Sequence, residues 1–239
     1  MKSKFNYVSI MLFITVLSGD SLAGTCDIHT CNGYDIPESA KNFIINGYSE
    51  IKVAHLQKET FLFLNSVGDI NNCFVLFKIE DEKIDKEPVI GQNGNFCNVT
   101  QVGDAIISTW REQGVWNSNV YRINSLGKFE LLYNDSCIDC QQVKRTYFNN
   151  GDVTRKILLS KGDGYLSRKE LEGYIVIPKA SLYQKPDVRQ KTKAYLIKGD
   201  SFFLIDMSND GFFYEIDYKS SSGNWAQYWI KSDDFEIKK

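Results

Sequence analysis

The stretch SKGDGYLSRKEL (160–171) is the part of this sequence whose spacing comes nearest to a calcium-binding loop. A twelve-residue EF-hand loop takes ligands from positions 1, 3, 5, 7, 9 and 12 and has glycine at position 6. With Gly164 at position 6 the second half fits, but Leu159 and Lys161 take positions 1 and 3. An apolar group and an ammonium cannot replace two carboxylates, so we expect a turn here and no calcium site.

Six cysteines form the second set of residues capable of chemistry. An even number in an exported chain predicts disulfides, and proximity in the sequence predicts the pairs Cys26–Cys31, Cys73–Cys97 and Cys137–Cys140. The motif CIDC (137–140) has redox spacing, but a redox motif lies at a helix N-terminus after a strand. KFELLYNDSCIDCQQVKRTYF has instead the pattern strand, turn, strand, with no histidine nearby for zinc. We therefore expect a structural disulfide.

Groups suited to catalysis are few in this sequence. His29 lies between two cysteines and His55 in a strand-like segment, with no spacing that indicates a shared metal. We find no Gly-x-Ser-x-Gly, His-Glu-x-x-His or phosphate-binding glycine motif. The carboxylate-rich runs 81–87 and 231–236 also contain lysine, which is typical of solvated loops. The sequence predicts a protein that is not an enzyme and uses no metal or cofactor.

Two tryptophans beside turn residues are better candidates for a functional surface. Trp116 follows Gly114, and Trp225 follows Gly223 and Asn224. An exposed aromatic side chain is a common hot spot in protein interfaces, although large rings also close the cores of small β-domains. We take Trp116 and Trp225 as candidate binding residues.

The N-terminus predicts export. Lys2 and Lys4 precede an apolar run at 8–18, and the small-residue motif SLA ends at Ala23. This is the pattern of a cleavable signal peptide at 1–23, and the run is too short for a permanent membrane span. We expect a periplasmic or secreted protein that is not integral to the membrane.

The charge of the chain limits its partners. It carries 28 lysines and arginines against 30 aspartates and glutamates, for a net charge of −2. No basic tract stands out, and nucleic-acid binding depends on such basic patches. We therefore expect no nucleic-acid partner.

Residues 24–170 have the pattern of an all-β domain. Short alternating segments recur, separated by turn clusters such as GDINN and NNGD; they include FIINGYSEIKVAHL (43–56), ETFLFLNSV (59–67), CFVLFKIE (73–80) and RKILLS (155–160). This spacing indicates antiparallel sheets arranged as a meander, a sandwich or part of a propeller.

Residues 172–239 resemble the bacterial SH3-like (SH3b) domain. The resemblance rests on a run of short motifs: LY (182–183) with Pro186, AYL (194–196), GD (199–200), FFY (212–214) and WI (229–230). It implies a small barrel that binds peptide or cell-wall material without catalysis. Tyr183 and Tyr228, within this part, therefore join the two tryptophans as candidate binding residues. The sequence departs from the pattern where Phe212 and Phe213 replace a common tryptophan, which puts the ligand groove in doubt.

Taken together, these features predict an exported binding protein with a disulfide-clipped N-terminal β-domain and an SH3-like barrel. Disulfide-bonded periplasmic proteins that lack catalytic groups are similar, as a class, to immunity or inhibitor proteins. The expected partner is then a protein toxin or a cell-wall hydrolase. Two alternatives stay open: binding of peptidoglycan without inhibition, and a wall hydrolase with an unrecognised catalytic β-domain.

Overall fold

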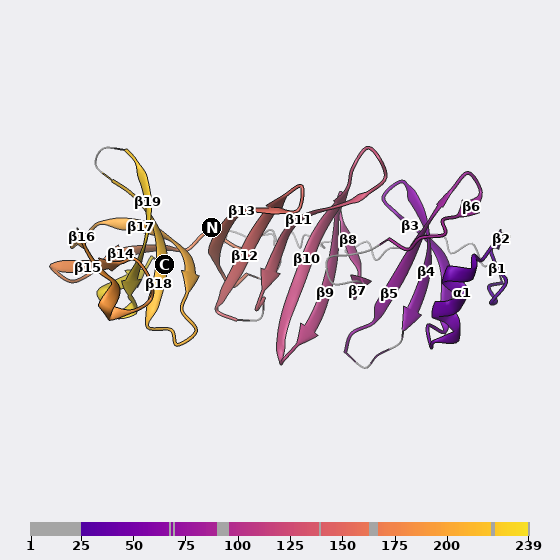
Figure 1. Cartoon of the computed structure of the whole chain (residues 1–239), viewed down its shortest axis with the longest axis horizontal. Coiled ribbons are helices and arrows are strands. Elements are labelled where there is room, and N and C mark those ends of the chain that lie inside the picture. The colour runs from indigo at the N-terminus through magenta and orange to yellow at the C-terminus, as the bar shows by residue number, and fades with distance from the viewer. Residues whose placement is uncertain are drawn as a thin grey trace, which may run out of the picture.

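A computed structural model of the chain describes residues 25–66, 68, 70–89, 96–138, 140–162, 167–220 and 223–238. The predicted signal peptide at 1–23 lies outside these residues. The described chain is all-β, as predicted, and its main sheets follow one another along a long axis (Figure 1). None of its helices has the length and apolar character needed to cross a bilayer.

The first sheet lies at the N-terminal end and is covered by a helix. Its strands are β3 (Glu50–Leu56), β4 (Glu59–Ser66), β5 (Cys73–Glu80), β6 (Lys83–Ile84) and β7 (Phe96–Cys97). Before it come the hairpin of β1 (Thr30–Cys31) and β2 (Tyr34–Asp35) and the helix α1 (Glu38–Ile45).

The helix corrects one prediction, because the segment 43–56 is not a single strand. Its first three residues end α1, and the strand begins at Glu50. Ala40, Phe43 and Ile44 are spaced three and four residues apart, which places them on one face of a helix. All three pack against the core of the first sheet.

Both faces of the first sheet are buried. Leu62 and Leu64 of β4 pack with the α1 residues, whereas Phe61 and Phe63 point the other way, toward the second sheet. Successive side chains of a strand alternate between faces, so the FLFL run of β4 can be buried along its whole length only between two layers. β5 pairs along β4 and is apolar on both faces in the same way.

The middle sheet is a six-stranded meander. Its strands are β8 (Thr100–Val102), β9 (Ala105–Glu112), β10 (Val115–Ile123), β11 (Phe129–Ser136), β12 (Gln142–Asn149) and β13 (Asp152–Ser160), and each pairs with the next. Of the arrangements that the sequence left open, this sheet adopts the meander.

The third sheet curls into a half-barrel at the C-terminal end (Figure 1). Its strands are β14 (Glu172–Ile175), β15 (Lys179–Tyr183), β16 (Lys191–Ile197), β17 (Ser201–Met207), β18 (Phe213–Lys219), β19 (Trp225–Lys231) and β20 (Phe235–Ile237). Short 3₁₀ turns occupy Val188–Gln190 and Ser232–Asp234. The turn between β17 and β18 is closed by the Gly211 N–H, which donates to the Ser208 carbonyl.

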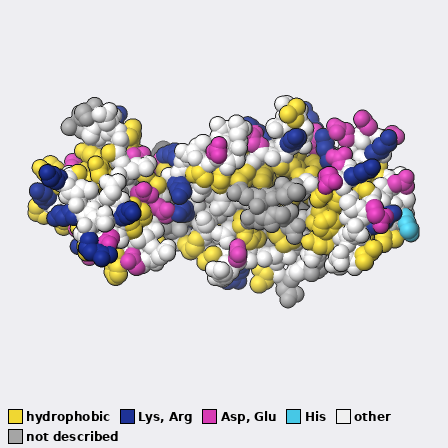
Figure 2. Space-filling model, in the orientation of Figure 1, with side chains coloured by type: hydrophobic (Ala, Val, Ile, Leu, Met, Phe, Trp, Pro, Cys, Tyr) yellow, Lys and Arg dark blue, Asp and Glu magenta, His cyan; other side chains and the backbone are white. Residues whose placement is uncertain are grey.

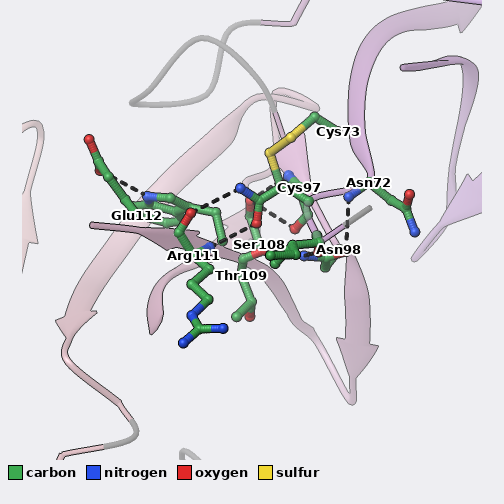
Figure 3. Close-up of a disulfide and its surroundings, with 11 residues drawn as sticks. Asn72, Cys73, Cys97, Asn98, Ser108, Thr109, Arg111 and Glu112 are labelled. Carbon is green, nitrogen blue, oxygen red and sulfur yellow. Dashed lines mark hydrogen bonds between the residues drawn. A yellow bond between two sulfur atoms is a disulfide. The ribbon is translucent and has the colours of Figure 1, made fainter. Parts of the chain in front are cut away.

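A hydrogen-bond network around the Cys73–Cys97 disulfide joins the first sheet to the middle sheet (Figure 3). The Ser108 hydroxyl of β9 accepts a hydrogen bond from the Cys97 N–H at 2.9 Å. The Asn98 side chain donates to the Thr109 carbonyl at 2.9 Å and accepts from the Asn72 N–H. Backbone N–H and C=O groups at this joint thereby find hydrogen-bond partners, although no continuous β-ladder joins the two sheets.

The half-barrel is fixed to the other end of the middle sheet. Leu158 of β13 is buried in the half-barrel core with Leu171 and Leu204. The Leu171 N–H donates to the Leu158 carbonyl, and the Leu204 N–H donates to the Leu171 carbonyl. Residues 24–170 and 172–239 therefore share a core at their boundary.

Candidate functional site

The structure places two of the predicted binding residues on β19 of the half-barrel. Trp225 is its first residue and is 54% exposed. Its ring leans on that of Phe203 at 6.3 Å between centroids, and the Lys219 ammonium lies 5.9 Å from the ring. Tyr228 faces inward and packs against the barrel core. Trp225 is thus the residue of this pair whose ring is offered to a partner.

The other two predicted residues lie apart from Trp225. Tyr183 of β15 is only 5% exposed, and its ring packs edge-on against Phe213 at 5.3 Å. It closes the half-barrel and presents little surface. Trp116 is half-buried near the start of β10, within the middle sheet. The structure does not bring the four residues together.

All three predicted disulfides are present: Cys26–Cys31, Cys73–Cys97 and Cys137–Cys140. The CIDC pair closes the connection between β11 and β12, where the Ile138 N–H donates to the Trp116 carbonyl. The motif therefore lies between two antiparallel strands, the setting that the sequence indicated for a structural clip.

The residues considered for calcium are only partly described, because 163–166 lie outside the described chain. Leu159, at the first ligand position, is 2% exposed. The carboxylate of Glu170, at the last position, forms an ion pair with Arg155 at 3.0 Å. The prediction that this stretch binds no calcium stays a prediction.

The two histidines lie on different elements of the N-terminal part. His29 is exposed in the Cys26–Cys31 loop, and His55 is exposed on β3, an edge strand of the first sheet, where its Nδ1 lies 3.1 Å from the Thr60 hydroxyl. Among the described residues, no three His, Cys, Asp or Glu side chains gather closely enough to hold a metal ion.

A groove of about 320 Å³ runs between β13 and the outer face of the half-barrel, and we call it the junction groove. One wall is β13, from Val153 to Ile157; the other wall is formed by Phe203, Ile205, Glu215, Asp217 and Gln227. Because Trp225 packs on Phe203, its exposed ring extends the apolar surface of this second wall. The volume is within the range of about 300–1,000 Å³ that is usual for binding sites.

Charges of opposite sign face each other across the junction groove. Burial raises the pKa of Glu215, and the nearby charge of Asp206 raises it further, against the opposing effects of Lys156 and Lys144. Burial also raises the pKa of Asp217, opposed by Arg155. The charged forms of both carboxylates are therefore less stable in the folded chain than they would be in water. A cationic or hydrogen-bonding group from a partner would stabilise their charged forms.

The sequence analysis did not identify Phe203 as part of a surface. Its signal is the alternation in SFFLID (201–206), since Phe202 and Leu204 are buried in the core whereas Phe203 and Ile205 line the groove. Two adjacent phenylalanines in one strand must point to opposite faces. What the strand alone does not reveal is that β13 lies opposite Phe203.

A buried ion cluster on the middle sheet was also not foreseen. Asp135 is fully buried; Arg145 donates to its two carboxylate oxygens at 2.6 and 2.8 Å, and Arg168 donates at 2.6 Å. Burial alone would lower the pKa of Arg145, but the hydrogen bonds and charge of Asp135 outweigh it and the pKa is raised. The Arg145 guanidinium also lies 4.0 Å from the Tyr133 ring centroid. These buried, charge-paired contacts indicate a structural role.

Figure 2 shows lysine and arginine side chains on the half-barrel and also at the N-terminal end, where they lie among acidic side chains. On the half-barrel, basic residues belong to β15, β16 and the turn between them, whereas Trp225 and the half-barrel wall of the junction groove belong to β17–β19. The aromatic surface and this basic surface are therefore separate features of the half-barrel.

Comparison of the chain with protein-family models, curated proteins and solved structures finds no match.

Proposed function

We propose that this chain is an exported, non-enzymatic binding protein that occludes a protein toxin or cell-wall hydrolase in the periplasm. The observation that carries the proposal is Trp225, which is exposed beside Phe203, a lining residue of the junction groove, and has the Lys219 ammonium 5.9 Å from its ring. Exposed tryptophans that already contact neighbouring side chains are common anchors of protein interfaces.

The surroundings of Trp225 favour a protein partner with a basic side chain next to an apolar one. Phe203 and Ile205 offer apolar surface, while Glu215 and Asp217 are carboxylates with raised pKa values. An arginine or lysine of the partner that enters the groove would supply the positive charge that these two carboxylates lack. We expect the resemblance of residues 172–239 to SH3b domains to reflect this recognition role.

The connections between the sheets suit a protein that blocks another protein's site. The hydrogen bonds of Ser108 and Asn98 beside the Cys73–Cys97 disulfide, together with the shared core at Leu158, hold the three sheets together. A preorganised surface avoids part of the ordering entropy that binding otherwise costs. This supports inhibition by occlusion.

The test is capture followed by an activity assay. Tagged protein lacking 1–23 is passed through periplasmic and toxin-containing extracts, the partner is identified, and its activity is titrated with the purified chain. We expect inhibition at a stoichiometric ratio, and Trp225→Ala should weaken it. Tyr195→Ala is the matched control, because Tyr195 is similarly exposed (51%) on β16 but its ring contacts Lys179, whereas the Trp225 ring contacts the groove residue Phe203. Soluble fragments released from purified wall by the chain alone would show an enzyme instead.

A further inference from the structure

The middle sheet presents a polar surface on the face where it meets its two neighbours. Side chains from adjacent strands stand opposite one another in two rows: Trp110, Asn117 and Ser136 in the first, and Asn119, Asn134 and Thr146 in the second. Together with Glu112 and Phe148 they line a hollow of about 340 Å³, which we call the polar hollow.

The two ends of this face are occupied by the other parts of the molecule. Ile106 and Tyr121, in the next row, are buried against the first sheet. On the opposite side, Leu158 enters the half-barrel core and Lys144 forms an ion pair with Asp206. Among the described residues, the polar hollow is therefore the part of the face that is left open between two covered ends.

The composition of the polar hollow differs from that of an ordinary solvated sheet face. An antiparallel sheet commonly keeps one face in water, and lysine, glutamate and aspartate are the residues most rarely buried. Here the two rows carry neutral amides and hydroxyls, and the single charged lining residue is Glu112. Apart from the exposed Glu112 carboxylate, the lining offers an ion no group of opposite charge. It suits a neutral, polar ligand.

The amides are positioned before any ligand arrives. Asn119 is only 3% exposed; its Nδ2 donates to the Tyr121 hydroxyl at 2.9 Å, and its Oδ1 accepts from Asn134 Nδ2 at 2.8 Å. In the described part of the chain, the Asn134 Oδ1, the Asn117 Nδ2 and the Thr146 hydroxyl make no hydrogen bond to protein. They offer an acceptor, a donor and a group that does both.

Aromatic rings border these polar groups. Trp110 stands directly opposite Asn117, and its indole N–H points to the Glu112 carboxylate at 3.4 Å. Phe148 contributes a second ring to the lining. A sugar ring combines an apolar C–H surface with hydroxyls that both donate and accept, so it needs a flat apolar surface beside mixed hydrogen-bonding groups. From this combination we propose that the polar hollow binds a neutral oligosaccharide.

The dimensions favour a chain of sugars over a single ring. Neighbouring strands lie about 4.8 Å apart, so the surface from β9 to β12 is about 14 Å wide. Ser136 also lines a second hollow of about 510 Å³ that continues to Gln142, Met207 and Tyr214. The Gln142 Oε1 there is buried and has no hydrogen-bond partner among the described residues. A linear glycan can follow both hollows toward the half-barrel.

This binding site does not depend on the proposed inhibitor role. It is tested by calorimetric titration of the chain lacking 1–23 with four neutral tetrasaccharides. These are the tetramer of N-acetylglucosamine, cellotetraose, maltotetraose and mannotetraose. We expect at least one to bind, with a change in tryptophan fluorescence. Trp110→Ala should weaken the binding about tenfold or more, and Thr146→Val, which keeps side-chain volume and removes one hydroxyl, should weaken it severalfold. Tyr195→Ala, on the half-barrel, should leave it unchanged.

Three results would overturn the proposal. The first is no binding by any of the four tetrasaccharides at millimolar concentration. The second is binding that Trp110→Ala and Thr146→Val leave intact in proteins with unchanged thermal stability, which would place the ligand elsewhere. The third is preference for a polyanion, such as oligogalacturonate, over the neutral sugars, which would show that charge governs recognition.

Discussion

The Lys144 ammonium on β12 lies 2.6 Å from the Asp206 carboxylate on β17, and this ion pair joins the middle sheet to the half-barrel. It links the half of the molecule that carries the polar hollow to the half that carries Trp225. Both residues line the hollow that adjoins Ser136, so the pair also forms part of its wall.

We expect this ion pair to contribute modestly to stability. In a double-mutant cycle with Lys144→Ala and Asp206→Ala, the coupling free energy should be about 0.5–1 kcal/mol, because both side chains are partly exposed and water screens the attraction. Urea unfolding of the four proteins measures it. Strictly additive single mutants would show that the pair contributes nothing.

The Cys73–Cys97 disulfide should matter more for stability than the Cys26–Cys31 disulfide. The sequence separation is 24 residues for the first and 5 for the second. Loop-closure entropy then predicts a loss of about 3 kcal/mol for Cys73→Ser with Cys97→Ser, and about 2 kcal/mol for the shorter loop. Guanidinium unfolding of each double variant decides the order, and equal or reversed losses would contradict it.

Asp135→Asn should be the most destabilising of the polar substitutions considered, by about 3–5 kcal/mol, because it leaves the buried Arg145 and Arg168 without a counter-charge. The matched control is Glu130→Gln, which breaks the exposed pair with Arg122 and should cost less than about 1 kcal/mol. Thermal unfolding compares them. A similar small loss in both would mean that the cluster is not structurally important.

Much of the fold follows from local patterns. The apolar segments 59–67 and 73–80 predict β4 and β5 closely, and the polar turn cluster between them marks where one strand ends and the next begins. The helix α1 escapes prediction because Phe43, Ile44 and Ile45 read equally well as the start of a strand. Eight residues give too short a pattern to separate the two periodicities.

The functional surfaces are harder to predict from the sequence, because they depend on strand register and on contacts between strands that are far apart in the sequence. Trp110 and Trp116 stand at the two ends of the segment 111–115 in the sequence. The two-residue turn at Gln113 and Gly114 pairs Trp110 with Asn117, which places the two tryptophans on opposite faces of the sheet. The junction groove depends on β13 meeting β17, and neither strand carries a local signal for that contact.

Glu215 should make stability depend on pH. Its folded pKa is raised above the ordinary value of 4.5, so the unfolded chain ionises first as the pH rises, and stability falls across that window. Glu215→Gln should therefore raise the melting temperature at pH 7 and have little effect at about pH 3, where the group is protonated in both states. Differential scanning calorimetry at the two pH values measures this. Glu82→Gln, in an exposed turn, is the control and should change neither value; a Glu215→Gln protein that melts lower at pH 7 would contradict the sign.

The affinity of the purified complex between this chain and its captured partner tests the central claim most directly. We predict a one-to-one complex that Trp225→Ala weakens about thirtyfold, equivalent to about 2 kcal/mol, while Tyr195→Ala leaves the affinity unchanged. The account would be contradicted if the Trp225→Ala and Tyr195→Ala proteins bound the partner as tightly as the parent chain, or if no protein partner were recovered while the chain sedimented with purified cell wall.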